Sequence, residues 1–426
     1  MTRARTINLL LVLISCLLAV ATFEGVARLF VSPCENCWGE LFGRQLPPFE
    51  LITEDAFLEH DRDAWYRNLI VDGRRITAGD MLGIFREDSI LGYAPKENAI
   101  SANDWWQVNN VGARSRVDLD TAYSNARVLV FGESFTNGSR LRQEETWPYL
   151  LDQLDDRFAV VNFGVDGYSM GQSYLRYRVL SESIEHDTAV LVFVPTEDLF
   201  REVNTLRTLV GWDMPMVLPR FVVAGDSIRL VRAPYSSMTE MVMANSERVS
   251  PLLREHLRAY DSFYSASQYE DTRFGGKLVS GKLLARWKFI RMRRSLMRQA
   301  LDIDSEPITI ASALFARMRR DVSDKSRSFV LVIMPGARDL AKYRTDETFR
   351  HRWTRMRDRV CPDSLSCLDL MDDMVNVPAG QIDVGYDGTH YGPKAGAAIA
   401  ETVHRRLGER LAVATPRSSH GGESPE

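Results

Sequence analysis

Two segments far apart in the chain hold residue types that together can perform nucleophilic chemistry. Ser134 follows a short apolar run and ends the tripeptide Gly132-Glu133-Ser134, while Asp387 and His390 stand three residues apart near the other end of the chain. A serine hydroxyl is a poor nucleophile at neutral pH unless a base stands beside it. His390 offers such a base, and Asp387 can orient its ring, because residues three apart on one helical turn or tight loop lie on the same side.

Strand and helix patterns alternate around both segments. Short apolar runs predict strands at 127–131, 159–163, 189–194, 329–333 and, more weakly, 368–371. Apolar residues at helical spacing predict helices at 146–154, 172–184, 308–320, 349–359 and 394–407. Strands that are apolar throughout and alternate with helices are typical of a parallel sheet covered on both faces. Open sheets of this kind bind ligands at their carboxyl edge, which is where Ser134 should lie.

Four motifs in order resemble those of the SGNH/GDSL hydrolase family. Gly132-Glu133-Ser134 is similar to the first family block, whose serine is the nucleophile. The stretch 160–169 is similar to the second block, in which the glycine at the position of Gly167 gives a backbone N–H to the oxyanion. The stretch 193–198 falls where the third block belongs, and 387–390 is similar to the fifth block, which supplies the Asp and His. Each motif alone is a weak signal, whereas four in order are a strong one.

The resemblance covers roughly 125–200 and 325–410, and it implies both a fold and a chemistry. The implied fold is α/β: a three-layer α/β/α flavodoxin-like SGNH fold with a central parallel sheet in the order 2-1-3-4-5 and, in this chain, a large insertion. The implied catalytic residues are Ser134, Asp387 and His390, with the backbone N–H groups of Ser134 and Gly167 at the oxyanion. The implied chemistry needs no cofactor and no metal.

This chain departs from the family pattern at two positions. Glu133 replaces the usual Asp before the serine, and Glu197 occupies the slot of an Asn whose amide donates to the oxyanion. An ionised carboxylate there would repel the oxyanion, and losing one donor typically costs about 10²–10³ in rate. A protonated Glu197 could still donate a hydrogen bond. The alternatives are a shifted register of the motif, or a donor supplied by Asn137 or Asn162.

The N-terminus carries an apolar segment that is just long enough to cross a bilayer. Ile7–Phe23 has Asn8 as its most polar member and follows Arg3 and Arg5. This positive flank favours a cytoplasmic N-terminus and export of the remainder. We expect residues 1–30 to be an uncleaved single-pass anchor in the inner or plasma membrane, with the catalytic domain periplasmic or extracellular. A cleaved signal peptide and a lipoprotein modified at Cys16 are the alternatives.

Cysteine usage agrees with export. Two local pairs, Cys34 with Cys37 and Cys361 with Cys367, could each close a small disulfide loop in an oxidising compartment. A redox or zinc site at Cys34-Glu35-Asn36-Cys37 is less favoured, because a second ligand cluster and a thioredoxin-like context are both missing. The net charge of −4 gives no reason to expect nucleic acid as a partner.

The patterns divide the chain into six parts. Residues 31–124 are expected to form an extension that packs on the core, with 31–100 irregular, and residues 125–200 and 328–414 to form the two parts of the core. Between them, 201–327 is too long for a loop and is expected to hold a hairpin around Gly225-Asp226 plus helices. The stretch 415–426 is predicted to be a disordered tail.

One helix of the insertion is strongly basic. Residues 282–299 hold seven basic side chains and no acidic one. Its expected buried stripe consists of Leu283, Leu284, Trp287, Ile290 and Met297. The basic face is either an ordinary solvated face or a surface that meets anionic lipid headgroups or an acidic glycan.

Two functions follow as hypotheses. The first is a serine esterase or O-acyltransferase that acts on acyl esters, chiefly acetyl esters, of envelope or secreted polysaccharide, with a lipid ester as the alternative substrate. Envelope polysaccharide machinery is then an expected partner, and the membrane another. The second is a catalytically weak binding or assembly component at the envelope, which Glu197 in the Asn slot favours and the intact Ser134, Asp387 and His390 set opposes.

Overall fold

A five-stranded parallel sheet forms the centre of the molecule. The computed structural model describes residues 3–51, 70–71, 74–75, 84–101, 104–119, 125–210, 216–236, 238–245, 249–270, 277–362, 366–385 and 388–414. The strands lie in the order β14-β13-β10-β8-β9. Their bounds are β8 (Ala126–Phe131), β9 (Phe158–Asn162), β10 (Thr188–Phe193), β13 (Ser328–Ile333) and β14 (Cys367–Asp369). Counted along the chain this order is 2-1-3-4-5, so the predicted α/β fold with its central parallel sheet is confirmed.

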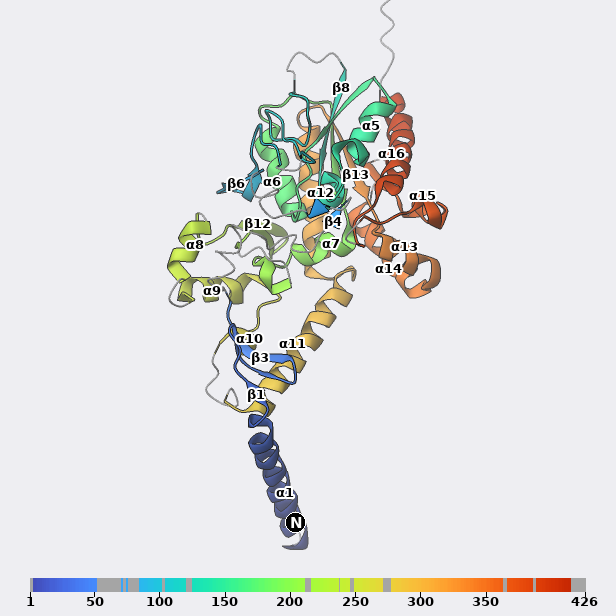
Figure 1. The fold of residues 1–426 in the computed structure, drawn as a ribbon. Coiled ribbons are helices and arrows are strands. Elements are labelled where there is room, and N and C mark those ends of the chain that lie inside the picture. The colour runs from blue at the N-terminus through green and yellow to red at the C-terminus, as the bar shows by residue number, and fades with distance from the viewer. Residues whose placement is uncertain are drawn as a thin grey trace, which may run out of the picture.

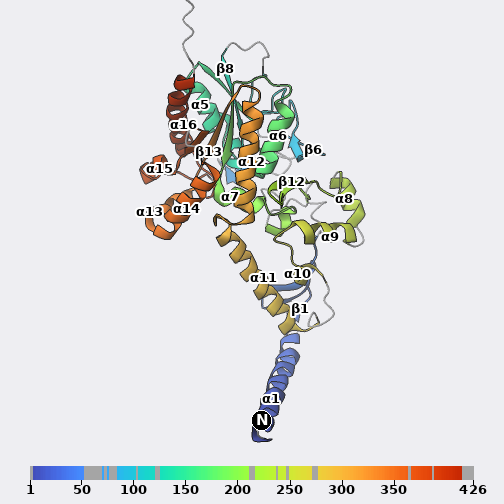
Figure 2. The same cartoon turned by 180° about the vertical axis from the view of Figure 1, so that it is seen from behind.

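Helices cover both faces of this sheet. One face carries α5 (Trp147–Leu154) and α16 (Pro393–Ala414), and the other carries α6 (Met170–Leu180) and α12 (Glu306–Ser323) (Figures 1 and 2). Every residue of β10 is buried. A strand buried on both faces must be apolar throughout, which is why continuous apolar runs identified these strands in the sequence. The helices α13 (Ala337–Thr345), α14 (Glu347–Val360) and α15 (Met371–Met374) complete this part of the chain.

The insertion between β10 and β13 has a smaller core of its own. Its predicted hairpin is confirmed as β11 (Arg220–Ala224) paired with β12 (Ser227–Val231), and Gly225 in the turn has a φ of 60°. Three helices follow, α8 (Met238–Asn245), α9 (Pro251–Tyr260) and α10 (Ala266–Tyr269). Buried residues such as Leu253, Leu257 and Phe263 pack this cluster beside α7 (Pro195–Arg201).

The described part of 31–100 is more regular than expected. Three short strands, β1 (Val31–Ser32), β2 (Cys37–Leu41) and β3 (Arg44–Phe49), form an antiparallel sheet that packs against α10 and α11. The expectation of irregular structure is therefore wrong for this stretch. Two more antiparallel pairs follow, β4 (Ile70–Val71) with β5 (Arg74–Arg75) and β6 (Phe85–Asp88) with β7 (Gly92–Pro95). The predicted tail 415–426 lies outside the described residues.

Two long helices, α1 and α11, extend from the α/β part of the molecule on the side of the N-terminus. Helix α1 (Arg3–Arg28) projects from the body, is mostly exposed, and is long and apolar enough to cross a bilayer (Figure 1). Helix α11 (Val279–Gln299) starts beside the last turn of α1 and runs towards the sheet (Figure 2). The small sheet β1–β3 lies alongside its first half.

The predicted buried stripe of α11 is wrong. Leu284, Trp287, Ile290 and Met297 are exposed, with 38–52% of each side chain accessible, and Leu283 is half-buried. The helix instead packs through the opposite face, where Val279, Lys282 and Phe289 are buried. Lys282 can lie on this face because its ammonium donates to the Pro47 carbonyl (2.8 Å) and its stem covers apolar surface.

Both predicted disulfides are present. Cys34 and Cys37 are joined at the turn that leads into β2, and Cys361 and Cys367 connect the end of α14 to the start of β14. Cys16 is the free cysteine and is exposed on α1. Disulfides persist in oxidising compartments, so this pairing agrees with an exported domain.

Replacing both Cys361 and Cys367 with serine should lower the free energy of unfolding by about 2 kcal/mol. The reason is that opening a short loop restores entropy mainly to the unfolded chain. Denaturant unfolding of the oxidised protein in detergent measures the change, with Cys16→Ser as the control because that thiol is unpaired. An unchanged midpoint in the double variant would contradict a stabilising role.

Candidate active site

Ser134 and His390 meet at the carboxyl edge of the sheet. Ser134 is the first residue of the single-turn helix α4 (Ser134–Asn137), three residues after the end of β8, and it is 2% exposed. Its Oγ lies 2.7 Å from Nε2 of His390, although the two residues are 256 positions apart in the sequence. The His390 ring packs against Phe135, with centroids 4.9 Å apart. The fold thus places a base within hydrogen-bond distance of the serine hydroxyl.

The loop that carries His390 is fixed on both sides. Gly385 donates its N–H to the His390 carbonyl (2.6 Å), and the Tyr391 hydroxyl donates to the Pro335 carbonyl just after β13. Asp383 accepts hydrogen bonds from the first turn of α16, including the Ala395 N–H at 2.8 Å. Asp387, the third member of the predicted set, lies outside the described residues. Its role is therefore still a prediction.

The second motif approaches Ser134 very closely. Gly167 has a φ of 75°, the left-handed backbone that its glycine identity allows. A Cβ on Gly164 would lie 2.3 Å from the Asn137 backbone nitrogen, so only glycine lets this loop pack against α4. The Tyr93 hydroxyl donates to the Asp166 carbonyl, which fixes the residue before Gly167 from the N-terminal extension. These contacts hold the Gly167 loop beside the nucleophile.

The side-chain amides of Asn137 and Asn162 donate hydrogen bonds between the second motif and α4. Asn137 Nδ2 donates to Asp166 Oδ1 (2.8 Å), and Asn162 Nδ2 donates to the Thr136 carbonyl (3.1 Å). Both interactions tie the second motif to α4. These contacts position the loops, and an oxyanion-donor role of either amide stays a prediction.

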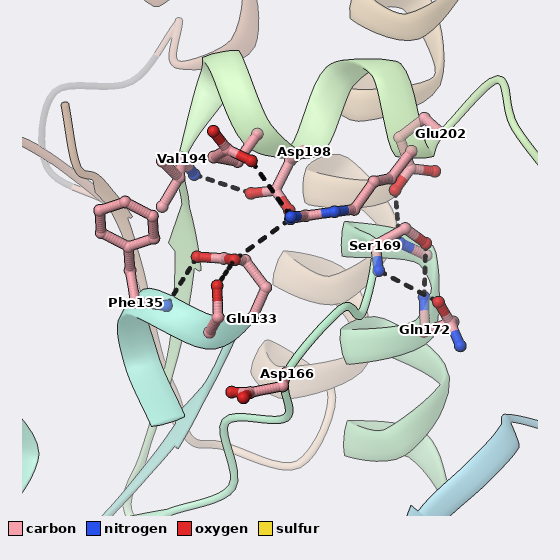
Figure 3. A network of polar contacts seen from close by, with 12 residues as sticks. Glu133, Phe135, Asp166, Ser169, Gln172, Val194, Asp198 and Glu202 are labelled. Carbon is pink, nitrogen blue, oxygen red and sulfur yellow. Dashed lines mark hydrogen bonds and ion pairs between the residues drawn. The ribbon is translucent and has the colours of Figure 1, made fainter. Parts of the chain in front are cut away.

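A buried arginine joins the two positions at which the sequence departs from the family pattern. Arg201, on α7, is 2% exposed, and its guanidinium contacts Glu133 Oε2 through one nitrogen and Glu197 Oε2 through the other, each at 3.1 Å. The Glu133 carboxylate also accepts the Phe135 N–H at 2.8 Å (Figure 3). The Ser134 hydroxyl also donates to Glu133. The nucleophile and Glu197 are therefore linked through one guanidinium.

The pKa values of the carboxyl groups of Glu197 and Asp198 on α7 are raised. Burial raises the pKa of Glu197, and the Glu133 and Asp339 carboxylates add to this effect, while Arg201 and His390 oppose it. Burial and the Glu133 carboxylate together hold the pKa of Asp198 well above its usual range. Asp198 accepts the Val194 N–H at 2.7 Å, as drawn in Figure 3. A raised pKa widens the pH range in which Glu197 is neutral and can donate a hydrogen bond.

Two arginines at the site were not found by sequence reasoning. Arg114, buried, donates to the carbonyls of Asn137 (2.6 Å), Gly138 (2.7 Å) and Leu141 (2.6 Å), and so holds the end of α4. Arg201 carries only one local signal, its spacing of four residues from Glu197 on a helix. The contacts of Arg114 with α4 and of Arg201 with Glu133 cannot be read from the sequence, because these partners are distant in the chain.

Comparisons with known proteins give similar folds only. No protein-family model and no curated protein matches the chain. Solved structures that align with it include two assigned to the lipolytic G-D-S-L family. The one from Desulfitobacterium hafniense has 15% identity and a TM-score of 0.30, over 66% of this chain and 99% of its own. The one from Veillonella parvula has 9% identity and a TM-score of 0.30, over 66% and 97%.

Proposed function

We propose that this protein is a serine-dependent acyl-transfer enzyme, an ester hydrolase or O-acyltransferase that works through an acyl-enzyme on Ser134. The observation that carries the proposal is the 2.7 Å contact between Ser134 Oγ and His390 Nε2 at the carboxyl edge of the sheet. A serine that meets a histidine base in this way can be activated as a nucleophile. The order of the sequence motifs supports the same chemistry.

The proposed reaction has two proton transfers at His390. The imidazole takes the Ser134 proton as the hydroxyl attacks the ester carbonyl, and then returns it to the leaving alcohol. Water or a sugar hydroxyl resolves the acyl-enzyme by the reverse sequence. In the resting site the Ser134 hydroxyl is shared between Glu133 and His390, so its hydrogen must turn towards His390 before attack. Asp387 is proposed to hold the imidazole and stabilise its cation.

Three donors are proposed for the oxyanion. The backbone N–H groups of Ser134 and Gly167 are the first two, since the Gly167 loop packs directly on α4. The third is the neutral carboxyl of Glu197 in place of the usual amide. Arg201 is a positioning residue in this scheme, because its guanidinium contacts Glu197 and Glu133 at the same time. Preorganised donors of this kind account for much of the rate in acyl transfer.

The activity should fall on both sides of an optimum pH. At low pH His390 is protonated and cannot accept the serine proton, and at high pH the ionised Glu197 opposes the oxyanion. Because the pKa of Glu197 is raised, its neutral form persists to a higher pH than in a free glutamate. Glu197→Gln keeps a neutral donor at every pH and should remove only the alkaline fall in kcat/KM. A variant profile that keeps the alkaline limb would contradict this role, and the exposed Glu185→Gln serves as the control.

We propose acyl esters, chiefly acetyl esters, on envelope or secreted polysaccharide as the substrate class. The support is the proposed export of the domain and the two disulfides, which suit an oxidising compartment. A lipid ester is the alternative substrate. Envelope polysaccharide machinery is the partner that this substrate class suggests.

We also propose that α1 is retained as a single-pass anchor. Glu24, in its last turns, accepts hydrogen bonds from the Val279 N–H (2.7 Å) and the Ser280 N–H (2.8 Å) at the start of α11. Ala27 packs into a small core with Leu41 and Val279. A signal peptidase that removed α1 would take part of this folded unit with it, and this favours the anchor over a cleaved signal peptide.

Glu24→Ala should weaken the junction between α1 and α11. The carboxylate satisfies backbone N–H groups at a helix start, and losing such a cap typically costs about 1–2 kcal/mol. Hydrogen exchange of the full chain in detergent should become faster in the first turn of α11 and stay unchanged in β10. Equal protection of that turn in both proteins would contradict the capping role.

A panel of esters tests the proposed activity. The full chain in detergent is given p-nitrophenyl esters of increasing chain length and acetylated polysaccharides, each with and without a sugar acceptor. Acetate release from polysaccharide indicates a hydrolase, and acetate transfer that needs the acceptor indicates a transferase. Folded protein that is inactive on every ester would favour the second candidate, a binding or assembly component, which the loss of the usual Asn at Glu197 also favours.

A further inference from the structure

Large apolar side chains are exposed around the end of α1. Six of them, here called the juxtamembrane collar, are accessible over 39–82% of their side chains: Leu29, Phe30, Phe42, Leu278, Leu284 and Trp287. They come from the end of α1, the β2–β3 turn and the first half of α11. Scattered single apolar residues are ordinary on a protein surface, whereas a concentration of large ones marks an interaction site.

The fold holds the collar next to the membrane-crossing helix. The Phe30 and Phe42 rings are 5.4 Å apart, because Val31 in β1 pairs with Leu41 in β2 and brings the β2–β3 turn to the end of α1. The Glu24 carboxylate fixes the start of α11 at the same level. The collar therefore lies where α1 leaves the hydrocarbon, in a headgroup layer roughly 5–8 Å thick.

Cations continue from the collar along one face of α11. Lys288, Arg291, Arg294 and Arg298 are exposed, and their spacing of three or four residues places them on the face that carries Leu284 and Trp287. Arg291 lies over the Trp287 ring at 4.8 Å. Side chains on a helix lean towards its N-terminus, which in α11 is the end beside α1. Lys288 lies nine residues after the start of α11, about 13 Å along the helix, and Arg298 lies about 28 Å along it.

We infer that the collar and this cationic face of α11 form a docking surface for the anionic bilayer that α1 enters. The collar side chains enter the headgroup layer, and the cations nearest to it, Lys288 and Arg291, attract the anionic surface of the bilayer electrostatically. An acidic polysaccharide would match the cations but offers no apolar medium for Phe30, Phe42 and Leu29. The inference rests on the proposed retention of α1. Docking of the collar fixes the orientation of the α/β part of the molecule above the membrane. Helix α11, which is about 30 Å long, then lies between the bilayer and the sheet.

Fluorescence of Trp287 in vesicles tests the docking. The full chain is reconstituted in phosphatidylcholine vesicles with or without phosphatidylglycerol, and part of the lipid carries bromine atoms that quench nearby indoles. The difference between the wild type and Trp287→Phe isolates Trp287 among the eight tryptophans. Trp105→Phe, in the region that packs on the core, is the matched control. Intact mass of the reconstituted protein checks separately that α1 is present.

Strong quenching of Trp287 that increases with phosphatidylglycerol is the expected result. Lys288→Gln with Arg291→Gln and Arg294→Gln should weaken docking about 100-fold, at about fivefold per cation, and return quenching to the phosphatidylcholine level. The same charge change at the exposed Arg178, Arg355 and Arg359 should leave it unaltered. No quenching of Trp287 in a chain that retains α1 would overturn the inference. So would a triple variant that loses binding to soluble polygalacturonate but keeps full quenching.

Discussion

Ser134→Ala is expected to reduce ester turnover by about 10⁴-fold or more, since the variant has no nucleophile for the acyl-enzyme. The substitution removes one oxygen from a buried site, so the fold should persist. Because Ser134 and His390 act as a unit, His390→Ala should cost a similar factor, and the double variant should lose little more than either. Turnover of p-nitrophenyl acetate by the full chain measures all three.

Ser312→Ala is the matched control for this series. Its hydroxyl donates to the Ile308 carbonyl (2.9 Å) on α12, away from the carboxyl edge of the sheet, so turnover should stay at the wild-type level. Residual activity in Ser134→Ala at the wild-type rate would mean that another group performs the hydrolysis. Strictly additive losses in the double variant would mean that Ser134 and His390 do not work together.

Arg201→Leu is expected to have the largest effect on stability, about 3–5 kcal/mol. The substitution leaves the Glu133 carboxylate, whose side chain is 1% exposed, without the guanidinium that it contacts at 3.1 Å. Denaturant unfolding in detergent measures the loss, and the exposed Arg355→Leu should change it by no more than about 0.5 kcal/mol.

A double-variant cycle identifies the origin of that loss. If the unpaired Glu133 carboxylate causes it, then adding Glu133→Gln to Arg201→Leu should recover part of the stability, because the amide is neutral. Arg201→Lys should not recover it fully, since an ammonium cannot contact two carboxylates in the same fork geometry. A loss below about 1 kcal/mol in Arg201→Leu, or a strictly additive cycle, would contradict the bridging role of Arg201.

The sheet was predictable because its strands are buried on both faces. A strand such as β10 must then be apolar throughout, and five such runs separated by helical patterns leave few other folds. The Ser134 and His390 segments were predictable for another reason, because their motifs occur in the order of a known family. The strands β1–β3 were not predicted, because they are short and because β3 contains Pro47 and Pro48.

Polar contacts between residues far apart in the chain could not be predicted from the sequence. Arg201 was missed because its contact with Glu133 spans 68 residues, and no local pattern announces such a pair. The buried face of α11 was assigned wrongly because hydropathy alone puts Trp287 inside and Lys282 outside. The structure reverses both, since the Pro47 carbonyl satisfies the Lys282 ammonium and the apolar residues gather at the end of α1.

The most direct test of the central claim is to trap the acyl-enzyme. The full chain is mixed with p-nitrophenyl acetate, quenched in acid at short times, and examined by intact mass and by peptide mapping. The expected result is one acetyl group on Ser134 that forms before steady turnover, is absent in Ser134→Ala, and persists longer if an acceptor is needed. Steady hydrolysis with no acetyl group on Ser134 at any time, or acetylation only at other residues, would contradict a serine acyl-enzyme mechanism.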